Sequence, residues 1–266
     1  MKISYATDLH GNETLIENFI SVSIKEKVDA IIFGGDICPR GFNSLDSRIN
    51  IQKQFLENHF VPLIKRVKTH NPIIEFYLIF GNDDYRVNYE ILLNNEIKGH
   101  FHLLHQAKKR IRQYTLIGYS YVNITPFSLK DWEKDDFAAI EPQGVLTTPR
   151  SDYTSIKSDL LNYSREKMEK TIFVTHAPPY GTNCDILHDG RHVGSKAIKE
   201  FIEKYQPLLV LSGHIHESPA ISRSFQDQIG KTVCINPGSD PFNNTGFVVI
   251  AQIKPGTILE IKRIKI

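Results

Sequence analysis

The sequence predicts an α/β fold in which two β-sheets pack face to face and helices cover their outer faces. Up to residue 212, short apolar runs alternate with longer amphipathic stretches, which is typical of a mostly parallel, buried sheet. From residue 217 onward the pattern changes to short strands with turns, which indicates antiparallel pairing in a second sheet. The sequence contains no evident linker or internal repeat, so we expect one domain over residues 1–266.

The first elements follow from apolar spacing and from helix signals. Asn12 is suited to begin a helix, because its side chain can accept a hydrogen bond from a backbone N–H of the first turn. A later helix is expected to kink near Pro62, since proline lacks the N–H that the helix needs. We expect strands at residues 2–7, 29–34 and 73–80, and helices after residue 12, over residues 51–67 and near residues 87–97.

The later elements are shorter and less regular. Residues 101–104 and 111–119 are expected to form edge or hairpin strands, and residues 120–150 to be irregular. We then expect a helix over residues 152–168, a strand at 171–175, a loop at 177–192, a helix at 195–204 and a strand at 208–212.

Composition excludes several classes of function. The chain carries 32 Lys and Arg against 30 Asp and Glu, so its net charge of +2 provides no broad field for nucleic acid or an anionic membrane. The N-terminal residues lack the apolar stretch of a signal peptide, and no apolar run approaches the length of a membrane helix. Three scattered cysteines are typical of reduced thiols, so we expect a cytoplasmic protein.

Metal-type ligands follow five of the apolar strands. Because ligands bind beyond the carboxyl ends of parallel strands, we expect these residues to converge at one edge of the sheet. Any single motif of this kind is usually a turn or a capped strand end, but five in order are hard to explain as turns. The strand ends carry Asp8 and His10, then Asp36, then Asn82 to Asp84, then His176, and finally His214 and His216.

The residue types indicate a transition-metal site. Asp8 and His10 are two residues apart, so on a strand their side chains point the same way and can reach one ion. Asp8, Asp36 and neighbouring carboxylates would repel one another strongly without a cation. Mixed imidazole, carboxylate and amide ligands suit Mn, Fe, Zn or Ni better than Mg or Ca.

The ordered set DLH, GGD, GNDD, TH and GHIH resembles the calcineurin-like metallophosphoesterase superfamily. More narrowly, THAPPYGTNCD, GRHVGS, LSGHIHE and INPGS resemble the predicted phosphoesterases related to the Icc cyclic-nucleotide phosphodiesterase. The resemblance implies a four-layer α/β/β/α sandwich holding two divalent transition-metal ions, with Mn²⁺ as the first choice. It also implies one ion bound by Asp8, His10, Asp36 and His216, and a second bound by Asp36, Asn82, His176 and His214, with a bridging hydroxide as nucleophile.

One position departs from the family pattern. Many members carry a histidine after the asparagine of the third motif, where it assists the transition state or the leaving group, whereas this chain has Asp83. An ordinary aspartate is ionised at neutral pH and repels phosphate. Either its pKa is raised, another group takes over, or the enzyme needs good leaving groups. We expect the nearby cations to keep Asp83 ionised.

Two segments are expected to wall the metal site and set substrate choice, namely residues 120–150 and 177–192. In the second, His192 is a candidate proton donor, and Arg191 is a candidate phosphate partner that could equally be a surface charge. The His-rich stretch at residues 100–105 and the basic residues 108–110 and 262–265 are expected to be structural or solvated.

The leading hypothesis is a metal-dependent phosphoesterase that hydrolyses a phosphodiester or phosphomonoester of a small molecule. The alternative is a non-catalytic scaffold on the same fold, but such relatives tend to lose ligands that all stand in this chain. A nuclease would need a basic groove, which the charge balance does not favour. The exposed edge of the strand-rich tail could support a homodimer.

Overall fold

The computed structural model describes residues 1–41, 44–151, 153–254 and 256–266. Its larger sheet is mixed, with strands β1 to β4 parallel and β14 antiparallel beside β1. The sheet order is β13-β14-β1-β2-β3-β4, and β15 pairs with β14. These strands are β1 (Lys2–Ala6), β2 (Ala30–Gly34), β3 (Glu75–Ile79), β4 (His102–Leu103), β13 (Ser239–Asp240), β14 (Thr245–Lys254) and β15 (Thr257–Lys265).

The second large sheet is also mixed, with four parallel strands in its centre and an antiparallel strand at each edge. Its order is β11-β12-β10-β9-β6-β5. The strands are β5 (Lys108–Ile111), β6 (Tyr114–Tyr119), β9 (Thr171–Thr175), β10 (Leu209–Leu211), β11 (Gln226–Ile229) and β12 (Thr232–Ile235), and a separate pair is formed by β7 (Val122–Asn123) and β8 (Glu133–Lys134).

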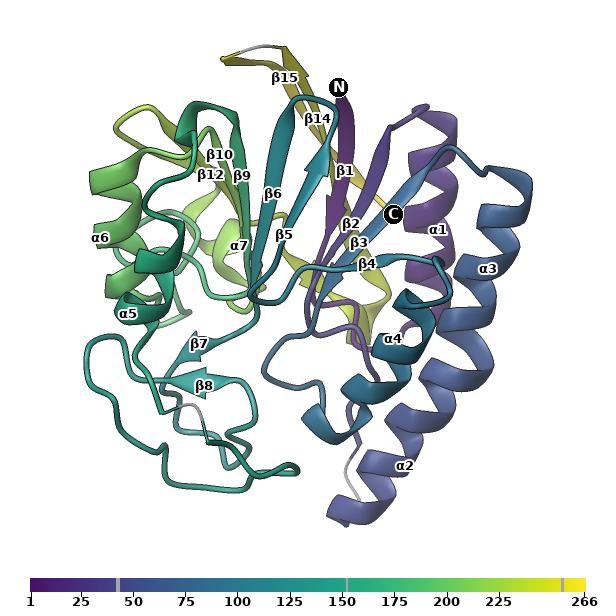
Figure 1. The fold of residues 1–266 in the computed structure, drawn as a ribbon, viewed down its shortest axis with the longest axis horizontal. Coiled ribbons are helices and arrows are strands. Elements are labelled where there is room, and N and C mark those ends of the chain that lie inside the picture. The colour runs from purple at the N-terminus through teal and green to yellow at the C-terminus, as the bar shows by residue number, and fades with distance from the viewer. Residues whose placement is uncertain (42–43, 152, 255) are drawn as a thin grey trace.

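Helices cover the outer faces of both sheets, so the layers run helix, sheet, sheet, helix across Figure 1. Apolar side chains from both sheets, among them Tyr5, Ile79 and Val174, form a buried core between the two sheets. On the larger sheet lie α1 (Glu13–Lys25), α2 (Leu45–Phe55), α3 (Val61–His70) and α4 (Tyr89–Glu96), and on the other side lie α5 (Ile156–Leu160) and α6 (Lys196–Tyr205). The predicted four-layer sandwich is confirmed.

Local signals place the first helices as expected. Asn12 caps α1, with its side chain accepting a hydrogen bond from the Leu15 N–H at 3.1 Å. The kink expected near Pro62 is a π-helical turn at Leu56–Phe60 between α2 and α3. There the Val61 N–H reaches back to the Leu56 carbonyl, which accommodates a proline inside the long helix.

The strand-rich tail differs from its prediction, because it does not form a sheet of its own. Its strands β14 and β15 extend the larger sheet, whereas β11 and β12 extend the second sheet. Apolar matching explains this division, since β14 places Ala251 opposite Ile3 and β12 places Cys234 beside Val210. The strands up to residue 212 are likewise divided, with β1 to β4 in the larger sheet and β5, β6, β9 and β10 in the second.

The helix expected over residues 152–168 is also shorter than predicted. It consists of α5 and a 3-10 turn at Leu161–Tyr163, and residue 152, where the prediction began, lies outside the described residues. The following polar residues, 164–167, supply no apolar face for a longer helix. The remaining short elements are α7 (Ser218–Ser222) and the 3-10 turns Arg86–Asn88, Met168–Lys170 and Pro241–Asn243. Within the described residues, no helix has the length and apolarity to cross a bilayer.

Candidate metal centre

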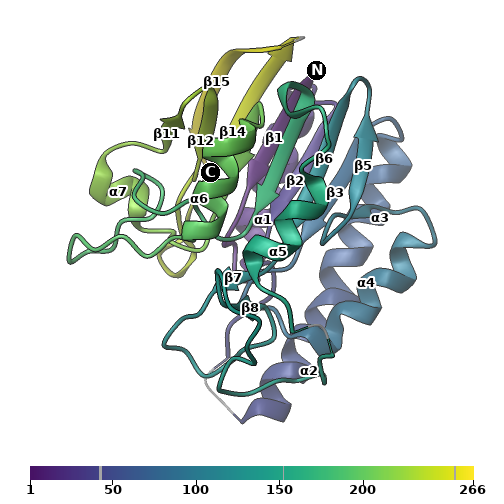
Figure 2. The same cartoon turned by 60° about the vertical axis from the view of Figure 1, so that its left-hand side comes forward.

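The predicted ligands stand at the carboxyl ends of strands from both sheets rather than at the edge of one sheet. Since the sheets pack face to face, the ends of β1, β2 and β3 lie opposite the ends of β9 and β10. Figures 1 and 2 place β7 and β8 beyond these same strand ends. Asp8 and His10 follow β1, Asp36 follows β2, Asn82 follows β3, His176 follows β9, and His214 and His216 follow β10.

The backbone at these strand ends is unusual. Asp8, His10, Asp36 and His214 all have positive φ angles, between 42° and 64°. For residues other than glycine such angles carry strain of order 1 kcal/mol, and they persist where the surroundings hold them. Hydrogen bonds between the segments after β1 and β2 hold Asp8 and His10 in this conformation. They run from the Asp8 N–H to the Gly35 carbonyl and from the His10 N–H to the Asp36 carbonyl.

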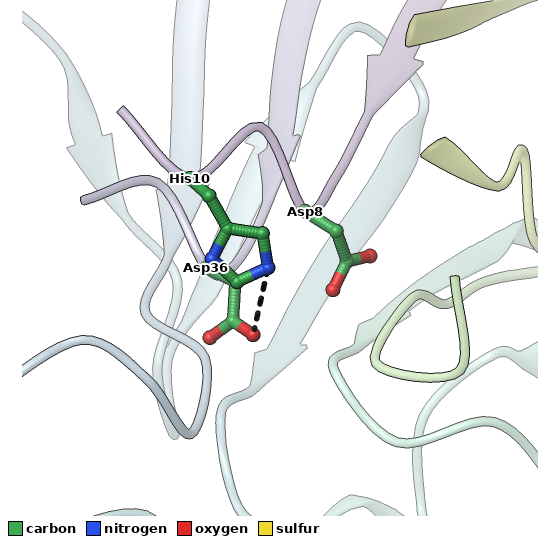
Figure 3. A group of neighbouring side chains, drawn as sticks. All are labelled: Asp8, His10 and Asp36. Carbon is green, nitrogen blue, oxygen red and sulfur yellow. Dashed lines mark ion pairs between the residues drawn. The ribbon is translucent and has the colours of Figure 1, made fainter. Parts of the chain in front are cut away.

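Asp8, His10 and Asp36 form a buried cluster, with one potential ligand atom from each lying within 4.8 Å of the others. Figure 3 shows the two carboxylates and the imidazole gathered between the ends of β1 and β2, with His10 Nε2 lying 3.8 Å from Asp36 Oδ2. Both ring nitrogens of His10 are buried without a hydrogen-bond partner. Buried polar atoms of native proteins normally have partners, so these nitrogens need an explanation.

Burial and neighbouring charges shift the pKa values of all three residues of the cluster. Burial lowers the pKa of His10 to about 3, so its imidazole is neutral. Burial raises the pKa of Asp8, whereas at Asp36 the charge and hydrogen bond of His176 outweigh burial and hold the pKa well below the usual range. A neutral imidazole beside two buried carboxylates fits a divalent cation, which would supply the missing partner of His10.

A second set of candidate ligands adjoins this cluster. His176 Nε2 lies 3.1 Å from Asn82 Oδ1 and 3.4 Å from Asp36 Oδ2, while its Nδ1 donates to the Gly34 carbonyl at 2.9 Å. A backbone carbonyl on one ring nitrogen is the usual way to orient the other toward a metal. His214 is half-buried beside His176, with 5.4 Å between ring centroids, and its backbone N–H donates to Asp8.

The second set of candidate ligands also has strongly shifted pKa values. Burial opposes a charged His176, but Asp36 outweighs burial and raises the pKa of His176 to about 9. Burial and the neighbouring His176 lower the pKa of His214 to about 3. His216 is more exposed and lies edge-on to His10, with 6.2 Å between the ring centroids. Asp36 therefore keeps a proton on His176, at the nitrogen that would have to lose it to bind a metal ion.

Asp84 braces this centre, a role that no sequence motif indicates. Its buried carboxylate accepts hydrogen bonds from the backbone N–H groups of Ile37, Cys38 and Gly81. These bonds tie the loop after β2 to the loop after β3, and so fix Asp36 relative to Asn82. Burial is the main reason that the pKa of Asp84 is raised to about 7.

A cavity of about 760 Å³, called here the large cavity, opens beside the metal centre. Asn82, His214 and His216 line it together with residues from the two segments that the sequence predicted as walls. From residues 120–150 these include Asn123 to Phe127 and Asp135 to Phe137, and from the second segment they include Tyr180, Leu187 and His192, with Val193, Gly194 and Lys196 just beyond it.

Residues 120–150 are more firmly fixed than an irregular lid would be. They contain the strand pair β7 and β8, and the Trp132 side chain is buried with its Nε1 donating to the Asp84 carbonyl at 2.7 Å. Lys130 and Glu133 form a buried ion pair at 2.8 Å. The segment therefore supplies core structure behind the metal centre as well as a wall of the large cavity.

Asp83 lies between the metal centre and a second hollow of about 310 Å³, called here the small pocket. Arg40 forms an ion pair with Asp83 and also lines both hollows. Burial and the nearby Asp36 raise the pKa of Asp83 to about 6. This raised pKa agrees with the first of the three alternatives for Asp83. The expectation that nearby cations keep Asp83 ionised stays a prediction.

The two candidates from the second wall segment have different surroundings. His192 lines the large cavity, with its Nδ1 2.7 Å from the buried carboxylate of Asp185. Arg191 is exposed, pairs with Asp189 through two of its nitrogens, and is not among the residues that line the cavity. Arg40, which the sequence analysis did not single out, lines the large cavity where Arg191 does not. Its sequence signal is its position four residues after Asp36, in the loop beyond a strand end.

Comparison with known proteins agrees with this geometry. Residues 1–218 match the calcineurin-like phosphoesterase family. The uncharacterized protein MJ1162 of Methanocaldococcus jannaschii is 28% identical over 244 residues, which cover 89% of this chain and 88% of that protein.

Solved structures show the same fold at low sequence identity. TT1561 of Thermus thermophilus superposes with a TM-score of 0.62 at 16% identity, covering 98% of this chain and 97% of that one. A dimetal phosphatase from Danio rerio gives a TM-score of 0.56 at 10% identity, covering 99% and 98% of the two chains. With the family match extending over most of its length, this chain belongs to the calcineurin-like phosphoesterases.

Proposed function

We propose that this chain is a phosphoesterase that uses two divalent metal ions to hydrolyse a phosphate ester of a small molecule. The observation that carries the proposal is the buried cluster of Asp8, His10 and Asp36, in which two imidazole nitrogens lack partners beside two carboxylates. Asp8, His10, Asp36 and His216 would hold one ion. Asp36, Asn82, His176 and His214 would hold the other, so that Asp36 is shared.

The donor set favours a transition metal, with Mn²⁺ proposed ahead of Fe, Zn and Ni. When bound, the ions would lower the pKa of an attacking water and neutralise charge on the phosphoryl oxygens. The Danio rerio neighbour is described as a dimetal phosphatase, which supports the proposal of two ions. The shared position of Asp36, 3.8 Å from His10 and 3.4 Å from His176, supports it as well.

The protein's own residues would seat the substrate in the large cavity. Asn82, His214 and His216 place the metal centre at its wall, so a phosphate bound to the ions has its organic group inside the cavity. Arg40 adds a fixed positive charge beside the site, because Asp83 holds its guanidinium. A volume of about 760 Å³ fits a small molecule and leaves the choice between monoester and diester open. We propose a cytoplasmic location, consistent with three cysteines that are free and buried.

Metal analysis of the purified protein, paired with hydrolysis assays, tests the proposal. We expect close to two transition-metal ions per chain and metal-dependent release of nitrophenol from a nitrophenyl phosphodiester, a nitrophenyl phosphomonoester, or both. Asp36→Asn should lose metal and activity, while Asp46→Asn in the first turn of α2 should keep both. A folded protein that binds transition metal but hydrolyses neither ester would favour the non-catalytic scaffold instead.

A further inference from the structure

The carboxylate of Asp185 organises the loop that carries His192. Asp185 is fully buried and accepts backbone N–H bonds from Gly181 at 3.0 Å, Thr182 at 2.8 Å and Gly194 at 2.9 Å. These donors come from both ends of the segment between β9 and α6. The carboxylate therefore closes this segment into a fixed loop rather than leaving it free above the cavity.

A fourth hydrogen bond joins this carboxylate to the imidazole of His192, a group that can act as a general acid. His192 Nδ1 lies 2.7 Å from Asp185 Oδ1, the same oxygen that accepts the Thr182 N–H. Because an ionised carboxylate only accepts hydrogen bonds, the hydrogen of the His192 contact must sit on Nδ1. The ring also packs edge-on against Tyr180, with 6.0 Å between centroids. His192 lines the large cavity, and because Nδ1 is held by Asp185, Nε2 is the nitrogen that the ring can offer to a bound ligand.

Three carboxylates near the metal centre are already engaged. Asp83, at the position of the family histidine, is held in an ion pair by Arg40 and lines the small pocket. In the large cavity, Asp135 accepts the backbone N–H groups of residues 137 and 138. Asp136 accepts from the Ser195 hydroxyl and the Lys196 N–H at the start of α6. His192 differs from these carboxylates in having one nitrogen fixed and the other available.

We propose that His192 Nε2 donates a proton to the leaving-group oxygen of the substrate, and that Asp185 is the positioning residue that makes this donation possible. The inference rests on the proposed phosphoesterase activity. As water oxygen bonds to phosphorus, the bond from phosphorus to the leaving oxygen breaks, and that oxygen keeps its electron pair and takes the Nε2 proton. The water proton passes to solvent, and solvent returns a proton to His192, so one water is consumed per ester.

Leaving-group dependence tests the role of His192. An alkoxide needs a proton to leave, whereas nitrophenolate does not, and general acid catalysis is worth about 100-fold or more. His192→Ala should therefore slow an alkyl phosphate ester by about 100-fold and the matched nitrophenyl ester by less than about 5-fold. Added imidazole should restore part of the alkyl rate. The control is His188→Ala, an exposed histidine of the same loop that does not line the cavity. Equal slowing of both esters would overturn the assignment.

The positioning role needs a readout that loop structure alone would not change. In the ¹⁵N NMR spectrum, neutral His192 should carry its hydrogen on Nδ1, and Asp185→Asn should abolish that preference. Asp185→Asn should also slow alkyl esters selectively, but add no further selectivity to His192→Ala. A neutral His192 that carries hydrogen on Nε2 would overturn the pairing, whatever the folding of the variants.

Failure of the underlying function would look different. If the metal-loaded protein hydrolyses no ester at all, the phosphoesterase proposal fails, while the NMR result still reports on the Asp185–His192 pair. If the protein is active but His192→Ala behaves like His188→Ala, only the assignment of the proton donor fails.

Discussion

The metal centre and the walls of the large cavity are built in opposite ways. Asp8, Asp36 and His176 leave their strands within one or two residues, and their side chains are buried. The walls come from long segments between β6 and β9 and between β9 and α6, and they expose apolar rings such as Phe127 at 59% and Phe137 at 48%. The chemistry is thus placed by the two sheets, and the contacts to the organic group are placed by loops.

Both walls of the large cavity are nevertheless held in fixed positions. Each wall is fastened by buried polar groups, residues 120–150 by the pair Lys130–Glu133 and the second wall by Asp185. The exposed rings instead face the cavity. Substitutions at the anchors should therefore alter stability or geometry, whereas substitutions at the exposed rings should alter substrate preference alone.

The largest effect is expected at the residue that the two proposed metal sites share. Asp36→Asn removes a charge from both sites, and losing about 4 kcal/mol of metal-based stabilisation would lower kcat/KM by about 1,000-fold. A chelator should also lower the melting temperature of the wild type, because bound metal at about 100 times its Kd stabilises by about 2.7 kcal/mol.

Calorimetry with and without the chelator checks this prediction, and Asp46→Asn serves as the control. The chelator should leave the melting temperature of Asp36→Asn unchanged. If Asp36→Asn keeps its full metal content, Asp36 is not the shared ligand and the proposed two-ion site is wrong.

The next prediction tests whether a wall segment also supports the centre. Trp132→Ala should destabilise the protein by about 3–5 kcal/mol, because it leaves an unfilled space in the core and removes the hydrogen bond to the Asp84 carbonyl. Trp132→Phe should cost less, since it keeps a ring against Phe80. Denaturant unfolding gives both values. A loss below about 1 kcal/mol for Trp132→Ala would mean that residues 120–150 wall the site without supporting the core.

These two regions also differ in how far they could be predicted. Asp8, Asp36 and His176 were predictable because each follows an apolar strand, and the ends of parallel strands gather in one place. The sequence could not show which strands belong to which of the two facing sheets. That assignment depends on pairings between distant residues, such as Ile3 of β1 with Ala251 of β14. Strand order is set by such long-range contacts and not by local pattern.

The walls were predictable in place but not in detail. Their length and position beyond the strand ends identified them, and His192 was found in this way. Arg191 and Arg40 are equally charged in the sequence, and each pairs with an aspartate, but only Arg40 lines the two hollows. Asp185 ends the motif THAPPYGTNCD, but its role depends on three backbone donors that the motif does not reveal.

A smaller effect should distinguish those two arginines. Arg40→Ala removes a guanidinium at the edge of both hollows, and losing a charged hydrogen bond of about 1.5–3 kcal/mol would raise KM by about 10- to 100-fold. Arg191→Ala should change KM by less than about 2-fold, since Arg191 is exposed and lines neither hollow. Inhibition by inorganic phosphate should weaken in parallel with KM. The reverse order of the two variants would restore Arg191 as the phosphate partner.

The smallest expected effect concerns the exposed rings. Phe137 lines the large cavity with its side chain partly in solvent, so an aromatic leaving group that covers about 50 Å² of it would gain about 1 kcal/mol. Phe137→Ala should then raise KM for a nitrophenyl ester by about 5-fold. A small alkyl ester cannot reach the ring, so its KM should not change, and neither should metal content or melting temperature. Ile97→Ala, at an exposed apolar residue that does not line the cavity, controls for a general surface effect. If both esters lose affinity equally, Phe137 supports the wall instead of contacting the substrate, and the separation between buried anchors and exposed contacts does not hold at this position.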